Sequence, residues 1–173
     1  YEAGDTNDEF SIMSVSKPVT SVGIMTLVQQ GKLSLDAKVF GADGLLNAKY
    51  PTTSESLKKI TVRELLWHTS GLETCNGQSE FWKSSSTIKD AMDVLMKDSK
   101  IIKFAPNMQF YYSNTGYFFL GRIIEEVSGQ TYENFIRSQV LNKCGIGNSM
   151  YLGNADGTSR ANEVEYVPES KPN

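Results

Sequence analysis

Residues 10–20 read FSIMSVSKPVT and place a serine and a lysine three positions apart at the start of an expected helix. Pro18 fixes that start, because proline lacks a backbone N–H and is tolerated in the first turn, where N–H groups have no partner within the helix. Ser14 then lies at the cap or in the first turn, and Lys17 follows one turn later on the same face. A serine hydroxyl beside a lysine is one arrangement that produces an activated nucleophile.

The Ser-x-x-Lys pattern has little specificity by itself. The chain contains it three times, at Ser14/Lys17, Ser56/Lys59 and Ser86/Lys89. Ser56 lies in a polar loop, and Ser86 is expected to cap a surface helix. Because a short motif often matches by chance, the spacing alone leaves Ser14 as either a nucleophile or a plain helix cap.

Composition narrows the class of protein. The chain has 173 residues, 39% of them hydrophobic, which is enough for one domain with a core. Its net charge of −3 does not predict nucleic acid or an anionic membrane as a partner, and no apolar run approaches the roughly 20 residues of a membrane span. Cys75, Cys144 and the single His68 make a poor zinc set, so we expect no metal and no cofactor.

Hydrophobic periodicity predicts five helices and very few strands. The first, over about 15–30, has a wide apolar stripe typical of a largely buried helix, and Gly31 is its expected stop. A capping box, Thr61-Val62-Arg63-Glu64, begins the second. The others are expected over about 87–97, 117–128 and 131–141. This pattern favours helices packed together, or the helical half of a larger domain.

A second motif, Tyr112-Ser113-Asn114, follows aromatic residues at an expected strand-to-helix turn. A tyrosine near a lysine ammonium loses its proton below its usual pKa of about 10 and can act as a base. Tyr132-Glu133-Asn134 has the same spacing, but Tyr132 lies within an expected helix, where its ring is more simply packing. The lone His68 is a weaker candidate base, because a histidine held by hydrogen bonds at a helix end explains its position equally well.

Three segments in order give the chain a resemblance to a known family. They are residues 13–20 (MSVSKPVT), 66–72 (LWHTSGL) and 111–117 (YYSNTGY), with support from 31–36 (GKLSLD) and 121–125 (GRIIE). Together they resemble the serine β-lactamase and penicillin-binding-protein superfamily, in the branch of class C β-lactamases, D-alanyl-D-alanine carboxypeptidases and related esterases. A helical bundle unrelated to this family would need three coincidences in order.

The resemblance implies a serine hydrolase that forms an acyl-enzyme on an amide, ester or β-lactam, with a small molecule or a peptide as its substrate. It makes Ser14 the acylated nucleophile and gives Lys17 the tasks of helping to deprotonate it and of stabilising charge. Tyr112 is then the general base and acid, and Asn114 holds the substrate amide. His68 belongs, in this family, to a structural turn near the site.

The chain also departs from the family pattern, because neither Lys-Thr-Gly nor His-x-Gly follows Asn114. We therefore expect a mainly α structure, the helical part of the α+β β-lactamase/transpeptidase-like fold with most of the antiparallel sheet missing. Residues 1–173 are expected to form a single incomplete domain, with the resemblance strongest over about 8–150. This suggests a fragment, a partial gene model or a degenerate copy that is weakly active or inactive. The alternative is a non-catalytic scaffold or binding module with the same fold.

Overall fold

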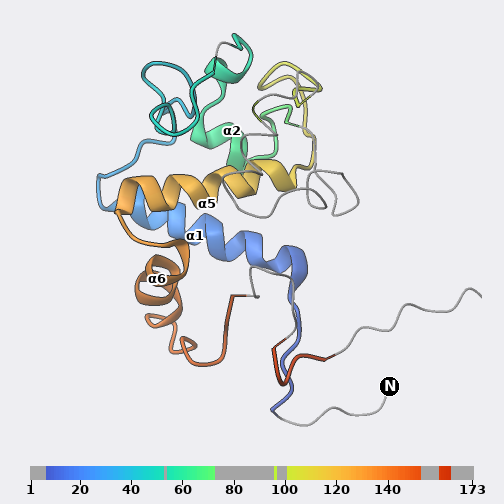
Figure 1. Ribbon diagram of the computed structural model, residues 1–173, viewed down its shortest axis with the longest axis vertical. Coiled ribbons are helices and arrows are strands. Elements are labelled where there is room, and N and C mark those ends of the chain that lie inside the picture. The colour runs from blue at the N-terminus through green and yellow to red at the C-terminus, as the bar shows by residue number, and fades with distance from the viewer. Residues whose placement is uncertain (1–6, 53, 73–95, 97–100, 153–159, 165–173) are drawn as a thin grey trace, which may run out of the picture.

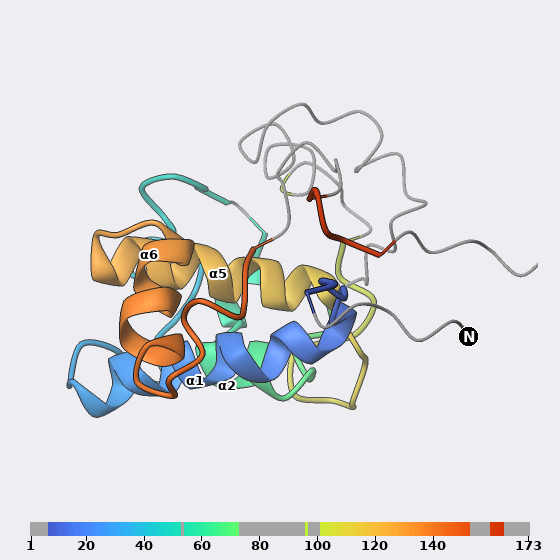
Figure 2. The same ribbon diagram turned by 90° about the horizontal axis from the view of Figure 1, so that it is seen from below.

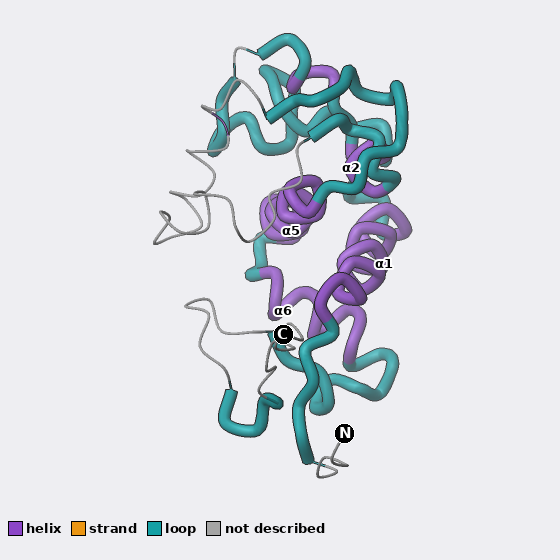
Figure 3. Tube along the Cα trace, turned by 90° about the vertical axis from the view of Figure 1, so that its right-hand side faces the viewer, coloured by secondary structure: helices purple, strands orange, loops and turns teal. Residues whose placement is uncertain are grey.

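A computed structural model describes residues 7–52, 54–72, 96, 101–152 and 160–164. Helices account for all the regular structure in these ranges, which contain isolated β-bridges but no strand (Figure 3). None of the helices there is both long enough and apolar enough to cross a membrane. The α-helices are α1 (Ser16–Gln29), α2 (Val62–Leu66), α5 (Asn114–Ser128) and α6 (Tyr132–Ile136), and the short helices are η1 (Met13–Val15), η2 (Leu57–Lys59) and the π-helical η3 (Arg137–Leu141).

The two long helices form the centre of the molecule. α1 and α5 lie side by side and run in the same direction, so both begin at the same end of the structure (Figure 1). α2 packs against α5, α6 packs against both α5 and α1, and η3 packs against α1 and α6. The resulting mainly helical body is the one expected from the sequence, and the helix expected over 87–97 lies outside the described residues.

Local sequence signals explain where α1 and α2 begin and end. α1 begins two residues before Pro18 and ends at Gln29, and Gly31 then adopts a left-handed φ of 68°. The capping box of α2 forms as expected, since Thr61 accepts the Glu64 N–H while the Glu64 carboxylate accepts the Thr61 N–H at 2.7 Å. Both boundaries therefore follow from the residues that flank the helix.

The start of α5 differs from the expectation. The helix begins at Asn114, three residues before the expected position, because the Ser113 hydroxyl accepts the Gly116 N–H at 3.0 Å and caps it. Residues 110–113 before it belong to no strand, so the expected strand-to-helix turn is an extended stretch leading into a helix. Gly129, with a φ of 69°, ends α5 as expected.

The first helix is less buried than its composition indicates. Val22 and Met25 are 50% and 46% exposed, so the apolar stripe of α1 is wider than the face that packs within the described residues. The packed face includes Gly23, where an added Cβ would lie 2.6 Å from the Ile136 side chain. A glycine there lets α1 approach the α6 region closely.

The N-terminal segment is held beside residues 160–164 (Figure 2). The Glu9 N–H donates to the Asn162 carbonyl at 2.8 Å, and the Glu9 carbonyl accepts the Val164 N–H at 3.0 Å. Arg160 adds an ion pair to the Glu9 carboxylate at 2.6 Å. These contacts fix the chain just before η1, and therefore just before Ser14.

Phe119 is one of the largest fully buried side chains among the described residues. It is fully buried on α5, and its ring centroid lies 4.8 Å from that of Phe40 in an edge-to-face arrangement. We expect Phe119→Ala to lower the free energy of unfolding by about 3–5 kcal/mol, measured by urea denaturation. Phe118→Ala, at the half-buried next position, is the matched control and should cost clearly less. Equal losses would contradict the placement of the core.

Candidate active site

Ser14, Lys17 and Tyr112 meet where α1 and α5 begin. The Ser14 Oγ lies 2.6 Å from the Tyr112 hydroxyl oxygen, and the Lys17 Nζ donates a hydrogen bond to the same Oγ at 3.1 Å. The Lys17 Nζ also lies 4.8 Å from the centroid of the Tyr112 ring. Ser14 is exposed and Lys17 is half-buried, so an outside molecule can reach the hydroxyl while the ammonium stays in place.

The parallel arrangement of α1 and α5 explains why residues 98 positions apart touch. Ser14 lies in η1, directly before α1, and Tyr112 lies two residues before α5. The Ser16 hydroxyl donates to the Met13 carbonyl at 2.7 Å and braces the turn around Ser14. Met13 itself has a φ of 45°, a left-handed conformation that is uncommon for methionine and that residues near functional sites often adopt.

The surroundings of Tyr112 favour its ionised form. Burial would raise the pKa of the phenol, but hydrogen bonds from Lys17 and Ser14 and the charge of Lys17 together outweigh it. The net result is a pKa below the usual 10.0 for tyrosine. A phenol with a lowered pKa, 2.6 Å from a serine oxygen, is placed to accept the serine proton.

His68 lies directly behind Tyr112. Its Nδ1 accepts the Ser113 N–H at 3.0 Å, and its ring stacks on the Tyr112 ring at a centroid distance of 4.6 Å. Burial, with a contribution from the positive charge of Lys17, lowers the pKa of the imidazole below its usual value. The histidine is thus held by hydrogen bonds after the end of α2, in agreement with the structural interpretation of the sequence.

The turn after His68 fastens the extended stretch that leads to Tyr112. The Gly71 carbonyl accepts the Lys103 N–H at 2.8 Å, and the Thr69 carbonyl accepts the Asn107 N–H at 2.7 Å. Gly71 has a φ of 74°, and any Cβ there would collide with the Phe104 carbonyl. A glycine is therefore required at this position for two independent reasons.

The remaining sequence candidates lie as follows. Asn114 is the first residue of α5, half-buried and two positions from Tyr112, whereas Ser14 has Tyr112 and Lys17 as hydrogen-bond partners. Tyr132 donates to or accepts from the Thr20 hydroxyl at 2.7 Å and packs between helices, as expected. Ser56 occupies the position before η2 without a side-chain capping hydrogen bond, and Ser86/Lys89 lie outside the described residues.

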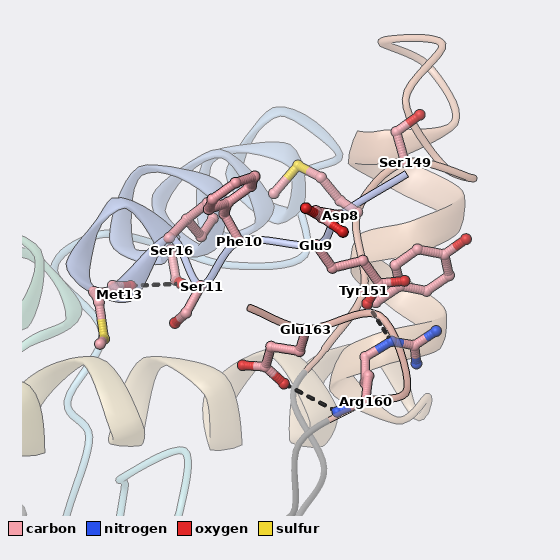
Figure 4. Close-up of a pocket in the computed structure, with 12 residues that line it drawn as sticks. Asp8, Glu9, Phe10, Ser11, Met13, Ser16, Ser149, Tyr151, Arg160 and Glu163 are labelled. Atoms are coloured by element: carbon pink, nitrogen blue, oxygen red, sulfur yellow. Dashed lines mark hydrogen bonds and ion pairs between the residues drawn. The ribbon is translucent and has the colours of Figure 1, made fainter. Parts of the chain in front are cut away.

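A cavity of about 400 Å³ opens between the N-terminal segment and residues 149–151, 160 and 163 (Figure 4). Its lining includes Met13 and Ser16, on either side of Ser14 in the chain, but not Ser14 itself. Arg160 crosses it, with its guanidinium 4.0 Å from the Tyr151 ring centroid and paired with Glu9. The cavity therefore adjoins the η1 turn without containing the three residues that meet there.

Comparison with known proteins gives the family to which the chain belongs. The family model described as Beta-lactamase matches residues 5–169. Penicillin-binding protein 4* of Bacillus subtilis is 34% identical over 164 residues, which are 93% of this chain and 34% of that protein. The chain thus spans about a third of the length of this relative.

Solved structures give the same result. A D-stereospecific amidohydrolase from Streptomyces sp. superimposes with a TM-score of 0.66 at 26% identity. The superposition covers 83% of this chain and 45% of the amidohydrolase chain. A penicillin-binding protein from Bacillus halodurans superimposes with a TM-score of 0.64 at 29% identity, covering 85% of this chain and 44% of its own. The chain is a partial domain of the serine β-lactamase and penicillin-binding-protein superfamily and belongs to the Beta-lactamase family.

Proposed function

We propose that this chain carries the catalytic residues of a serine hydrolase that acts through an acyl-enzyme on an amide, ester or β-lactam. The observation that supports this best is the pair of contacts on the Ser14 Oγ, from the Tyr112 hydroxyl at 2.6 Å and from the Lys17 Nζ at 3.1 Å. A nucleophile bonded to a group that can take its proton is the general arrangement of covalent catalysis.

Each residue then has a defined task. Tyr112, as phenolate, takes the proton of Ser14, and the serine oxygen forms a bond to the substrate carbonyl carbon. Lys17 assists the deprotonation and stabilises the negative charge on the phenolate. The tetrahedral intermediate collapses as the bond to the leaving group breaks, and Tyr112 returns the proton to that group. Water then forms a bond to the acyl carbon as Tyr112 takes one of its protons, and the bond to the Ser14 oxygen breaks as Tyr112 returns that proton to the serine; Asn114 holds the substrate amide.

The names of the similar proteins support this class of substrate. They include an amidohydrolase that is D-stereospecific and two penicillin-binding proteins, so a small molecule or peptide with a reactive carbonyl is the expected substrate. Residues 1–173 are proposed to belong to one domain, with weak activity by themselves. The reason is that neither Lys-Thr-Gly nor His-x-Gly follows Asn114, and loss of one oxyanion donor costs about 10²–10³ in rate.

The missing third motif also favours a second candidate, a non-catalytic scaffold or binding module with the same helical body. The two differ in whether Ser14 reacts. In a binding module, Ser14 is a hydroxyl at the start of a helix and Tyr112 is a packing partner. An active-site probe separates these cases because it needs an activated oxygen and no particular substrate.

The decisive experiment is the intact mass of the chain after incubation with a fluorophosphonate, followed by fragmentation to locate the label. We expect one adduct, on the peptide that contains Ser14. A label spread over several serines would contradict the proposal. So would the absence of label both here and in a longer chain that includes a third motif, and either result would favour the binding module.

A further inference from the structure

We infer that His68 positions Tyr112 for its reaction with Ser14, and that protonation of the His68 ring releases it and switches the site off in acid. This inference deepens the proposed function and rests on it. The experiment below includes a readout that does not depend on catalysis, so that failure of one can be told from failure of the other.

The backbone on both sides of Tyr112 is bonded to His68. The Tyr111 N–H donates to the His68 carbonyl at 2.7 Å, and the Ser113 N–H donates to the His68 Nδ1 at 3.0 Å. Because Nδ1 accepts a hydrogen bond, the proton of the neutral ring is assigned to Nε2. One residue therefore clamps the chain immediately before and after the proposed base.

The ring of His68 also fixes the plane of the phenol. It stacks on Tyr112 with an interplanar angle of 30°, and it lies 5.0 Å from the Tyr117 ring centroid. Tyr117 is anchored in turn, since its hydroxyl donates to the Leu66 carbonyl at 3.1 Å and lies 3.0 Å from the Ser21 Oγ. Phe110 packs against the His68 ring edge-to-face. The aromatic stack thus connects Tyr112 to the helical body.

Protonation would undo this arrangement for a geometric reason. A cationic imidazole carries a hydrogen on Nδ1, which would then face the Ser113 N–H, donor against donor. The step is simple binding of a solvent proton to Nδ1, with loss of one hydrogen bond. The backbone after Tyr112 would then lose its hydrogen bond to His68, and the Tyr112 hydroxyl would no longer be held in position beside Ser14.

The charges around His68 oppose protonation as well. The ionisable groups that face it are Lys17 from α1, Tyr112 from the extended stretch and Tyr117 from α5. On α2, Arg63 forms an ion pair with Asp36, and the Glu64 carboxylate accepts the Thr61 N–H, so both charged groups have other partners. Since burial and Lys17 both lower the pKa of His68, the ring is neutral at pH 7 and charges only in acid, below the usual 6.5.

The inference predicts a break in the pH profile of acylation. If Tyr112 is the base, the acylation rate rises about tenfold per pH unit below the pKa of Tyr112. Below the pKa of His68, the proton on His68 must also be removed before the site is active, so the slope doubles. His68→Asn keeps an acceptor near Nδ1 and a residue type that tolerates the φ of 57°, but it cannot titrate. We expect this variant to lose the break and to keep the Tyr112 slope.

His68→Phe is the complementary variant, because it keeps a ring for stacking and removes the acceptor. We expect its acylation rate to fall about 10- to 100-fold with little change in the affinity for the probe, since a small misplacement of the base costs rate rather than binding. A break that persists in His68→Asn, or a full rate in His68→Phe, would overturn the inference.

A structural readout completes the test. His68 is the only histidine in the chain, so its ring nitrogen signals in an NMR titration identify themselves. We expect the Nε2–H form at pH 7, and we expect the Ser113 amide and the Tyr112 ring signals to shift together with the titration of His68. If they do not follow it, the positioning role is wrong, whether or not Ser14 is acylated. If they follow it and no probe reacts, only the proposed function fails.

Discussion

The Ser14→Ala variant is expected to take up no fluorophosphonate, whereas the unchanged chain takes up one equivalent on this residue. The reason is that the variant lacks the hydroxyl that has a proton acceptor at 2.6 Å and an ammonium donor at 3.1 Å. Because Ser14 is exposed, the change removes a hydroxyl without opening a cavity, and the free energy of unfolding should change little. Intact mass and a urea unfolding curve measure both effects.

The chain supplies its own matched control. Ser56 and Lys59 repeat the Ser-x-x-Lys spacing at η2, where Ser56 precedes the helix as Ser14 does in the sequence pattern. Ser56→Ala is expected to label like the unchanged chain. If Ser56→Ala removed the adduct, or if Ser14→Ala retained it, Ser14 would not be the labelled serine and the assignment of the nucleophile would be wrong.

Removal of the Tyr112 hydroxyl is expected to have the next largest effect. Tyr112→Phe keeps the ring that stacks on His68 but removes the oxygen beside Ser14, so the acylation rate should fall by about 10²–10⁴-fold. Stopped-flow or timed-quench labelling gives this rate. Tyr111→Phe is the control, because the Tyr111 ring packs on Phe104 at a centroid distance of 5.3 Å rather than on the site.

The pH dependence of acylation tests the proposed role of Tyr112 as the base. A base must lose its proton before it can act, and Lys17 and Ser14 lower the pKa of Tyr112 below 10.0 despite the opposing effect of burial. The acylation rate should therefore rise with pH and level off below pH 10, and Tyr112→Phe should lack this rise. An unchanged profile in the variant would assign the titration to a different group.

Much of the fold could be predicted from single residues that end or begin helices. Pro18, Gly31, Thr61 and Gly129 act through the backbone of their own neighbours, so their effect is readable without any tertiary structure. The start of α5 differs from the prediction because Ser113 has two roles, the middle of the Tyr-x-Asn motif and the cap of the helix, and serine is a preferred cap residue. The exposure of Val22 and Met25 could not be predicted, since it depends on what packs against α1.

The site divides in the same way. Ser14 and Lys17 are close because one helical turn separates them, and this could be predicted from spacing. That Tyr112 meets them depends on the packing of α1 against α5, which the resemblance suggested but periodicity could not supply. The left-handed conformation of Met13 had no signal in the sequence, because methionine is not a residue type that favours it.

The contact between Ser14 and Tyr112 also has a consequence for the folding of the molecule. It closes a loop of 98 residues, and contacts of such long range form late because their loop entropy must be offset by the rest of the core. Helical turns can thus exist in a chain that has no reactive serine. Under the proposed function, reactivity at Ser14 is therefore a mark of completed folding, and a partly folded molecule is not acylated by the carbonyl compounds that it encounters.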